Sequence, residues 1–591
     1  MEPAAGQSNR PPLLRLLPLL LIVAAGLHGP ESLLASPTKM SLLAQRLELP
    51  GVPVEILNVD LDRDGVRDLA VVVASTSWAE TGFEEEMQVD DAGTFVDVLT
   101  VVPTLLDRRQ LLFFRGRPAG GFEPEPRTLE LAESVHALEA GPSGAPLVAW
   151  TDDGLGEIVI GAAEELALEL RAAAASLFSG SSSFLPRSGL AVDVDGDREI
   201  DLLLPVDRGL ALYRGSAGGF ERAPRLTLEP PVDFGPPQAT PQPAGGGPEK
   251  KSEIPSAASQ REDEERSRDR AGRRSIALPQ VVDLDGDGRP ELVYRDPEHS
   301  RTRLRALRQG ADGSFGAPFD PLAGKALSEE REIAWIGDLD GRPGAELVTT
   351  AEIPNEKDSM RAELAEAKRP RSRVFVHRLD GRGVWNPDPV STFEIEGYVF
   401  EGGGGDDGSD DGGDGFEFTL PSGVHDLDGD GRRDLVAIRL EFSLFEAMRI
   451  MTTHSIRLGL DFAVYRQGEG MTFRPVTGLD LAGELKLRLD DVSIGQISSF
   501  AGDFDGDGKA DFVQLGRGRK VTIHRGNEGA RYAPSPDLSV TLEREPADVA
   551  LAQVRDLDGD GRSDLVVTQP AGSGEIGARA VLELYLSRGS P

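Results

Sequence analysis

The chain of 591 residues contains no cysteine. Disulfide bonds, thiol catalysis, a lipidated cysteine anchor and cysteine-based zinc sites are therefore excluded. Histidine is also scarce, with seven residues and no HExxH pattern, and the sequence has no GxSxG elbow, P-loop or Rossmann fingerprint. We therefore expect a protein that is not an enzyme. Paired catalytic carboxylates on inserts would escape this reasoning and leave an enzyme as the alternative.

Basic residues are in short supply, with 63 Lys and Arg against 100 Asp and Glu and a net charge of −37. A chain of this charge repels phosphate backbones and anionic lipid surfaces. We therefore expect neither nucleic acid nor an anionic membrane as a partner.

Long apolar runs are absent except for residues 16–27, which follow Arg10 and Arg15 and precede small residues. This arrangement is typical of an export signal, and the run is short for a membrane span. We expect residues 1–35 to be a signal peptide, with an uncleaved anchor as the alternative. The protein is then exported to the periplasm, the cell surface or the medium, and the mature chain has no membrane span.

What the chain does contain is a nine-residue pattern, Asp-x-Asp-x-Asp-Gly-x-x-acid, at six places. Carboxylates crowded at positions 1, 3, 5 and 9 repel one another unless a cation lies between them. Oxygen ligands in this number suit calcium, whereas zinc and copper prefer His or Cys, and magnesium needs a stricter octahedron. The predicted calcium ligands are Asp60, Asp62, Asp64 and Asp68; Asp193, Asp195, Asp197 and Asp201; Asp283, Asp285, Asp287 and Glu291; Asp426, Asp428, Asp430 and Asp434; Asp503, Asp505, Asp507 and Asp511; and Asp556, Asp558, Asp560 and Asp564.

Two alternatives to this interpretation need to be weighed. An EF-hand begins in the same way, but it needs a helix on each side and a glutamate at position 12. Apolar, β-branched runs follow these loops instead, which places each loop inside a β-hairpin. Position 12 is not a glutamate in any of the six loops; it is Val71, Leu204, Tyr294, Ala437, Gln514 and Val567. The second alternative, Asp-Gly turns that bind nothing, remains open.

Some copies of the pattern are altered. Arg198 replaces the position-6 glycine of the second copy, so we expect that loop to be strained or changed. A seventh copy, 338–346, has Arg342 in place of the third carboxylate, and we expect its guanidinium to pair with Asp338 and Asp340 in the cation's place. Whether this loop binds a metal is open. A further copy at 138–150 keeps the strand and lacks the acids, which indicates that the repeat is first of all structural.

A second pattern follows most of the loops. A strand ends in an aromatic residue or histidine, then come arginine, a glycine-containing turn, an aromatic residue and proline, as in Tyr213-Arg214, Gly219-Phe220 and Pro224. Each unit is then strand, acidic loop, strand, link, strand, tight turn and strand. A four-stranded antiparallel unit of ~45–50 residues is typical of one propeller blade.

Together these two patterns resemble the FG-GAP and VCBS repeat families, and the same calcium loop occurs in the β-propeller of integrin α-chains. The resemblance covers most of residues 50–588. It implies an all-β fold for residues 36–588, a β-propeller of seven four-stranded antiparallel blades, with eight as the alternative. It also implies that the side chains at positions 1, 3, 5 and 9 bind calcium, together with a backbone carbonyl at position 7.

Several segments interrupt the repeats. Residues 228–275 are rich in Pro, Gly and mixed charge, and we expect them to be disordered, whereas 401–415 reads as a flexible acidic glycine loop. Two inserts, 75–107 and 441–458, look ordered, and each should separate the second and third strands of its unit.

These observations lead to one expected function and one alternative. We expect an exported, monomeric calcium-binding propeller that acts as a binding or scaffold module for an unknown protein or polysaccharide ligand. Calcium would staple the loops; regulation by calcium is less suited, because extracellular modules that bind at about 10⁻⁴–10⁻³ M stay loaded. The alternative is a polysaccharide-active lyase or hydrolase with catalytic residues on the inserts.

Overall fold

All regular elements in the described part of the chain are β-strands. The computed structural model describes residues 40–75, 108–174, 184, 190–206, 209–228, 279–295, 304–322, 331–353, 371–386, 388–397, 423–441, 455–476, 482–488, 498–515, 519–543, 552–570 and 579–589. Within these residues there is no helix of the length and apolarity that a membrane crossing requires. The predicted signal peptide 1–35, the glycine loop 401–415 and all but the first residue of 228–275 lie outside the described residues.

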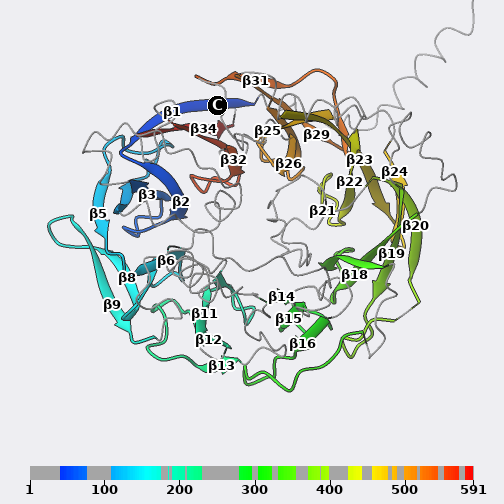
Figure 1. Cartoon of the computed structure of the whole chain (residues 1–591), viewed down its shortest axis with the longest axis horizontal. Coiled ribbons are helices and arrows are strands. Elements are labelled where there is room, and N and C mark those ends of the chain that lie inside the picture. Colours follow the sequence, from blue (N-terminus) through cyan, green and yellow to red (C-terminus); the bar gives the residue numbers. More distant parts are fainter. Residues whose placement is uncertain are drawn as a thin grey trace, which may run out of the picture.

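The described strands form eight antiparallel blade sheets and one two-stranded hairpin, and the blades follow one another around a closed ring in sequence order (Figure 1). The first strand of a sheet, such as β2 or β6, lies near the centre of the ring, and the fourth, such as β5 or β9, lies at the rim (Figure 1). The predicted all-β propeller is thus confirmed, with eight blades, the alternative to seven. The blade formed around 147–151 supplies the additional unit.

The strands of the first four blades have the following bounds. Blade 1 comprises β2 (Val52–Val59), β3 (Asp68–Ser75), β4 (Arg108–Phe114) and β5 (Arg127–Leu131). Blade 2 comprises β6 (Val135–Ala140), β7 (Leu147–Thr151), β8 (Gly154–Ile160) and β9 (Leu166–Ala172). Blade 3 comprises β10 (Ala191–Val192), β11 (Asp201–Val206), β12 (Gly209–Tyr213) and β13 (Leu226–Leu228). Blade 4 comprises β14 (Gln280–Val282), β15 (Glu291–Arg295) and β16 (Leu304–Leu307), with an isolated bridge from Ala306 to Phe319 at the place of a fourth strand.

The remaining four blades follow the same plan. Blade 5 comprises β17 (Glu332–Gly337), β18 (Glu346–Glu352), β19 (Arg371–Arg378) and β20 (Ser391–Glu396). Blade 6 comprises β21 (Gly423–His425), β22 (Asp434–Glu441), β23 (Ser455–Gly468) and β24 (Thr472–Pro475), with β25 (Ala482–Arg488) paired to the first half of β23. Blade 7 comprises β26 (Ser498–Gly502), β27 (Asp511–Leu515), β28 (Lys520–His524) and β31 (Leu538–Thr541), and a small hairpin of β29 (Gly526–Asn527) and β30 (Arg531–Tyr532) belongs to its turn. Blade 8 comprises β32 (Ala552–Arg555), β33 (Asp564–Pro570), β34 (Ala580–Arg588) and β1 (Ser41–Leu49).

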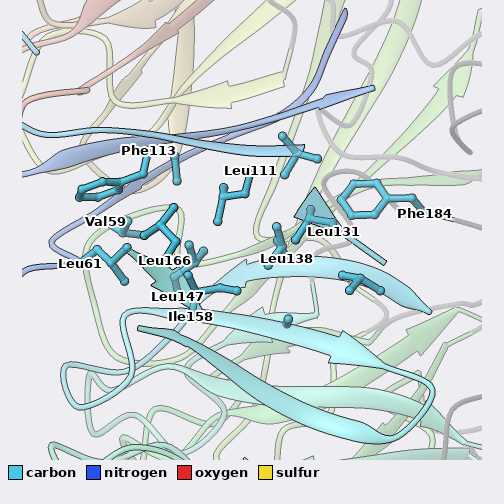
Figure 2. Packing of buried hydrophobic residues seen from close by; sticks show 14 of the residues in the cluster. Val59, Leu61, Leu111, Phe113, Leu131, Leu138, Leu147, Ile158, Leu166 and Phe184 are labelled. Atoms are coloured by element: carbon cyan, nitrogen blue, oxygen red, sulfur yellow. The ribbon is translucent and has the colours of Figure 1, made fainter. Parts of the chain in front are cut away.

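The core lies between the faces of neighbouring blades. The second strands have apolar neighbours on both sides, which is why β3 is buried at every residue before Ser75 and reads as a continuous apolar run. Figure 2 shows one of these interfaces, where Phe113 and Leu111 of blade 1 meet Leu138 and Ile158 of blade 2. Each blade therefore depends on the next for its core.

The ring is closed by a strand from the other end of the chain. β1 pairs with β34 over nine residues, from Ser41 opposite Arg588 to Leu49 opposite Ala580. Leu47 and Leu49 are buried in one cluster with Leu582 and Leu584. Closure in this way leaves no blade as an open end of the array. β1 matches neither repeat pattern, because it is the fourth strand of blade 8, whose acidic loop and arginine belong to the other three strands.

The alternation of strand direction separates the molecule into two faces. The link from first to second strand and the turn from third to fourth strand lie at one end of each sheet, here called the loop face. The link from second to third strand and the connection to the next blade lie at the opposite end, here called the connection face. β3 ends at Ser75 and β4 begins at Arg108, so the insert after residue 75 separates the second and third strands, as predicted. The insert at 441–458 has the predicted place too, but its last four residues belong to β23.

Candidate metal centres

Six acidic loops link the first and second strands of blades 1, 3, 4, 6, 7 and 8, so all predicted ligands lie on the loop face. Blade 5 has the altered loop 338–346 in this place, and blade 2 has the loop 141–146 without acids. Because every blade except blade 2 carries an acidic loop at this place, the carboxylate clusters are arranged around the ring seen in Figure 1.

The carboxylate at position 9 is buried and connects the loop to the third strand. Asp68 is 0% exposed and accepts hydrogen bonds from the backbone N–H of Leu61, at 3.0 Å, and of Gly116, at 2.8 Å. Asp564 of blade 8 accepts from Leu557 and Ser587 in the same way, at 2.8 and 2.7 Å. Each carboxylate oxygen keeps a further lone pair, so these bonds leave room for a cation. The position-9 acid is therefore a structural residue whether or not metal is bound.

Burial also changes the acidity of this carboxylate. Removal from water raises the pKa of Asp68 to about 6 and the pKa of Asp564 to about 7, and the backbone hydrogen bonds only partly offset it. The pKa values of Glu291, Asp434 and Asp511 are raised to about 7 for the same reason. Neighbouring carboxylates, such as Asp558 and Asp556 beside Asp564, add to the increase.

The carboxylate at position 1 organises the turn. In the loop of blade 4, Asp283 accepts from the backbone N–H of Gly286 through Oδ1, at 2.8 Å, and from that of Gly288 through Oδ2, at 2.9 Å. Asp287, at position 5, accepts from the N–H of Arg289 at 2.9 Å. These bonds fold the nine residues so that the acids converge.

The converged carboxylates fit an oxygen-liganded cation. Oxygens of Asp283, Asp285 and Glu291 all lie within 4.8 Å of one another, and so do those of Asp60, Asp62 and Asp68. In the blade 4 loop, Asp285 Oδ1 and Glu291 Oε1 are buried and have no hydrogen-bond partner among the described residues. A buried oxygen without a partner is costly, and a hard cation would satisfy both atoms. In blades 3 and 6 the converging oxygens come from positions 1, 3 and 5.

A feature that the predicted ligand set omits is an arginine beside each acidic loop. Arg115 follows the third strand of blade 1, and its Nε lies 2.7 Å from Asp62 Oδ2. The arginines that correspond to it in the other blades with acidic loops pair with the position-3 aspartate of their own loop: Arg214, Arg308, Arg378, Arg466, Arg525 and Arg588. The signal was present in the second sequence pattern, which contains this arginine, but the pattern alone does not reveal its partner.

The charge of a typical loop matches one divalent cation. Position 7 is Arg289, Arg432, Lys509 or Arg562 in four of the six intact loops. In blades 4, 7 and 8, the four carboxylates, this cation and the arginine at the end of the third strand leave two negative charges, whereas in blade 6 Arg433 at position 8 leaves one. The loop of blade 1 has Val66 at position 7 and Arg67 at position 8, and in the loop of blade 3 Glu199 at position 7 accepts from Ser143 of blade 2.

The altered loop of blade 5 differs from the expectation. Arg342 is 70% exposed and only its Nε comes near Asp340, at 3.7 Å, while Asp338 accepts from the backbone N–H of Gly341. The close partner of Asp340 is Arg378, which also reaches Glu346 at 3.2 Å. The expectation that Arg342 pairs with both aspartates is therefore wrong. The strand residue Arg378 is placed rigidly beside the loop, whereas Arg342 points to solvent.

The loops contact one another around the ring. The N–H of Arg433 in blade 6 donates to the carbonyl of Leu339 in blade 5 at 2.9 Å, and the N–H of Ser563 in blade 8 donates to that of Asp503 in blade 7 at 2.7 Å. A Cβ atom on Gly429, at position 4 in blade 6, would lie 2.7 Å from the carbonyl oxygen of Gly508 in blade 7. Backbone hydrogen bonds and close packing thus link the loops of neighbouring blades.

Arg198 occupies the left-handed backbone region, as the glycines at position 6 do. Its φ is 75°, and its N–H still donates to Asp193 Oδ2 at 2.8 Å. The loop of blade 3 therefore keeps the shared geometry and is strained, one of the two outcomes expected. Gly288 has φ 83° at the same position of blade 4, and a Cβ atom there would meet open space.

We predict that Arg198→Gly stabilises the protein by up to about 1 kcal/mol, because relief of left-handed strain exceeds the entropy cost of glycine. Gly288→Arg, the reverse change in the neighbouring loop, should cost a similar amount. Denaturant unfolding in chelator measures both. Equal effects of the same sign would contradict the assignment of the strain to the backbone.

We predict that the metal-free protein becomes more stable as pH falls from 8 to 6. The folded state binds a proton on Asp564 with a pKa of about 7, while the ordinary value for the unfolded chain is 3.8. The folded state therefore holds more protons between these values, and the free energy of unfolding rises on acidification. Calcium should reverse the trend, because its ligands must be deprotonated.

The control for this pH effect is Asp564→Asn, which removes one titrating group. The slope of the unfolding free energy against pH, from melts in chelator, should decrease by up to about 1.4 kcal/mol per pH unit, the value for one proton. An unchanged slope would show that this carboxyl group does not titrate in that range.

Comparison with known proteins connects these loops to a repeat family. Residues 503–567, which span the loops of blades 7 and 8, match the FG-GAP-like repeat family. No curated protein matches the sequence.

Solved structures with similarity include an Agrocybe aegerita lectin that recognises non-reducing terminal N-acetylglucosamine, at 14% identity, a TM-score of 0.37, and 76% of this chain and 95% of that chain covered. The exotype rhamnogalacturonan lyase YesX is 12% identical, with a TM-score of 0.23 and coverage of 90% and 73%. Rhamnogalacturonan lyase YesW is 13% identical, with a TM-score of 0.25 and coverage of 90% and 68%. Similarity at this level does not bear on what this chain binds. The chain is a β-propeller, and the family match in blades 7 and 8 together with the repeated acidic loop supports a propeller of the FG-GAP/VCBS repeat type.

Proposed function

We propose that the protein is an exported calcium-binding propeller that serves as a binding or scaffold module for a protein or polysaccharide. The observation that carries the calcium assignment is the blade 4 loop. There, three carboxylates converge within 4.8 Å, and two of their buried oxygens have no hydrogen-bond partner among the described residues. The two negative charges left in this loop favour a divalent cation.

Calcium, when bound, supplies charge neutralisation. The side chains at positions 1, 3, 5 and 9 of the six intact loops would hold it. The chain itself already positions these groups, since position 9 is anchored to the third strand and position 1 shapes the turn. Because neighbouring loops are hydrogen-bonded, neutralising one loop also stabilises the junction between two blades. A structural role for the ion follows.

The arrangement of the two faces supports a binding role. The acidic loops lie on the loop face, whereas the long inserts after β3, β18 and β22 leave from strand ends at the connection face. A ligand on the connection face would not compete with the ions. Export is supported by the apolar run 16–27. An exported protein without cysteine needs a means of stabilisation other than disulfides.

We predict that millimolar calcium raises the melting temperature of the purified chain by many degrees relative to excess chelator. Six sites at ten-fold saturation would add roughly 8 kcal/mol, because each ion binds only the folded state. A matched control is Asp283→Asn with Asp285→Asn, which should reduce the shift by about one site's share. A folded protein whose melting temperature is the same in both buffers would refute the calcium assignment.

We predict that the calcium-loaded propeller captures one defined protein or polysaccharide without altering it. The measurement combines binding to a panel of immobilised glycans and to envelope extract with an assay for new reducing ends or unsaturated products. Reproducible retention with no product supports a binding module. Product release from any glycan would instead establish the enzyme alternative, and no retention of any candidate would leave a structural role only.

A further inference from the structure

The arginine at the end of the third strand lies beside the carboxylates that are predicted to bind calcium. In blade 6, Arg466 Nε lies 2.6 Å from Asp428 Oδ2, and its Nη2 lies 3.3 Å from Asp430 Oδ2. These two aspartates are positions 3 and 5 of the loop, so one guanidinium spans two of the four predicted calcium ligands. Asp428 is buried, so loss of the guanidinium with no cation in its place would leave a buried charge unpaired, which is costly.

Within this chain, the arginine and the position-3 aspartate occur together. Blade 5 has lost its position-5 carboxylate but keeps both Asp340 and Arg378. Blade 2 has no acidic loop, and Val159, two residues before the turn that begins at Gly161, takes the place of the arginine. In blade 8 the arginine is shifted two residues along the strand, to Arg588, and still pairs with Asp558 at 2.6 Å, while Asp560 lies at the longer distance of 3.8 Å. The arginine is therefore associated with the acidic loop and not with the blade fold as such.

The arginines hold their loops in two different ways. Arg115 in blade 1 spans positions 3 and 5, at 2.7 and 2.9 Å, as Arg466 does. Arg214 in blade 3 pairs with position 3 at 2.7 Å. In blade 4 a single nitrogen of Arg308, Nε, lies 3.5 Å from Asp285 and 3.9 Å from Glu291 at position 9. Among the described ion pairs, neither of these two reaches position 5.

We propose that this arginine is an internal cation that sets the calcium affinity of its loop, and that the spanned loops 60–68 and 426–434 bind calcium most weakly. This inference rests on the proposed calcium binding. In a spanned loop the ion must displace a guanidinium that holds two ligands, at positions 3 and 5. In blade 3 this arginine pairs with position 3 alone, and in blade 4 one nitrogen lies 3.5 Å or more from its carboxylates. The spanned loops are also the ones that hold their shape best without metal.

A lysine in place of this arginine distinguishes the effect of bridging two aspartates from the effect of the positive charge alone. Lysine keeps the positive charge but cannot reproduce the planar two-nitrogen bridge. We predict that Arg466→Lys and Arg466→Met each raise the affinity of the blade 6 loop for calcium by about ten-fold or more, the strength of a charge-assisted hydrogen bond. Arg308→Lys, the matched control in blade 4, should change its loop's affinity less than about three-fold, because its arginine does not span positions 3 and 5.

The experiment is equilibrium dialysis of the full chain against buffered free calcium, with bound ions counted per chain. The wild-type curve should contain a late phase of two ions, and either Arg466 variant should move one ion from the late to the early phase. Melts of the same variants in chelator supply a second readout: the melting temperature should fall without calcium and recover with it.

The possible outcomes distinguish this inference from the proposal on which it depends. A wild-type chain that binds no calcium would refute the proposed function itself. Calcium binding by the wild type with no gain in the Arg466 variants, or with weaker binding, would show that the arginine positions the ligands and does not compete with the ion. An equal gain in Arg308→Lys would show that the span is irrelevant.

Discussion

The structure depends on how negative charge is held at the loop face. In five of the six intact loops a buried aspartate at position 9 ties the loop to the end of the third strand, as Asp68 does through Leu61 and Gly116. Burying a charge is costly unless it is paired or hydrogen-bonded. Backbone N–H groups, an arginine and a divalent cation can each offset part of the cost of burying a carboxylate. The chain itself supplies the first two.

This distribution of counter-charges explains how the repeat can decay without loss of the fold. Blade 5 loses a carboxylate and keeps Arg378, so its loop retains a cation beside Asp340. Blade 2 loses acids and arginine together, and a short hydrogen-bonded turn, from Gly141 to Pro146, takes their place. In both blades the apolar second strand remains buried between neighbours. The blade is therefore maintained by interblade packing, and the metal sites are added to it.

The two faces of the ring differ in the length of the segments that connect their strands. The loop face has short, hydrogen-bonded links that connect one blade to the next, which suits a stabilising ion. The connection face receives the long inserts, which suits recognition, because rigid scaffolds commonly present functional segments on loops. Function and stabilisation can then vary separately along the sequence.

The sequence by itself determined the blade plan and the candidate ligands, because both are local: strand alternation, the nine-residue spacing and the turn residues each need only a few neighbouring positions. The sequence also contains Arg466 and Leu47, but it does not show which residues they contact. What only the tertiary structure decided was their partners, since Arg466 meets Asp428 across 38 residues of chain and β1 meets β34 from the far end. The choice of eight blades over seven was likewise tertiary, because blade 2 is recognised by its packing after its acidic loop is lost. Pairings between distant segments leave no periodic trace in one chain, so they could not be predicted from local pattern.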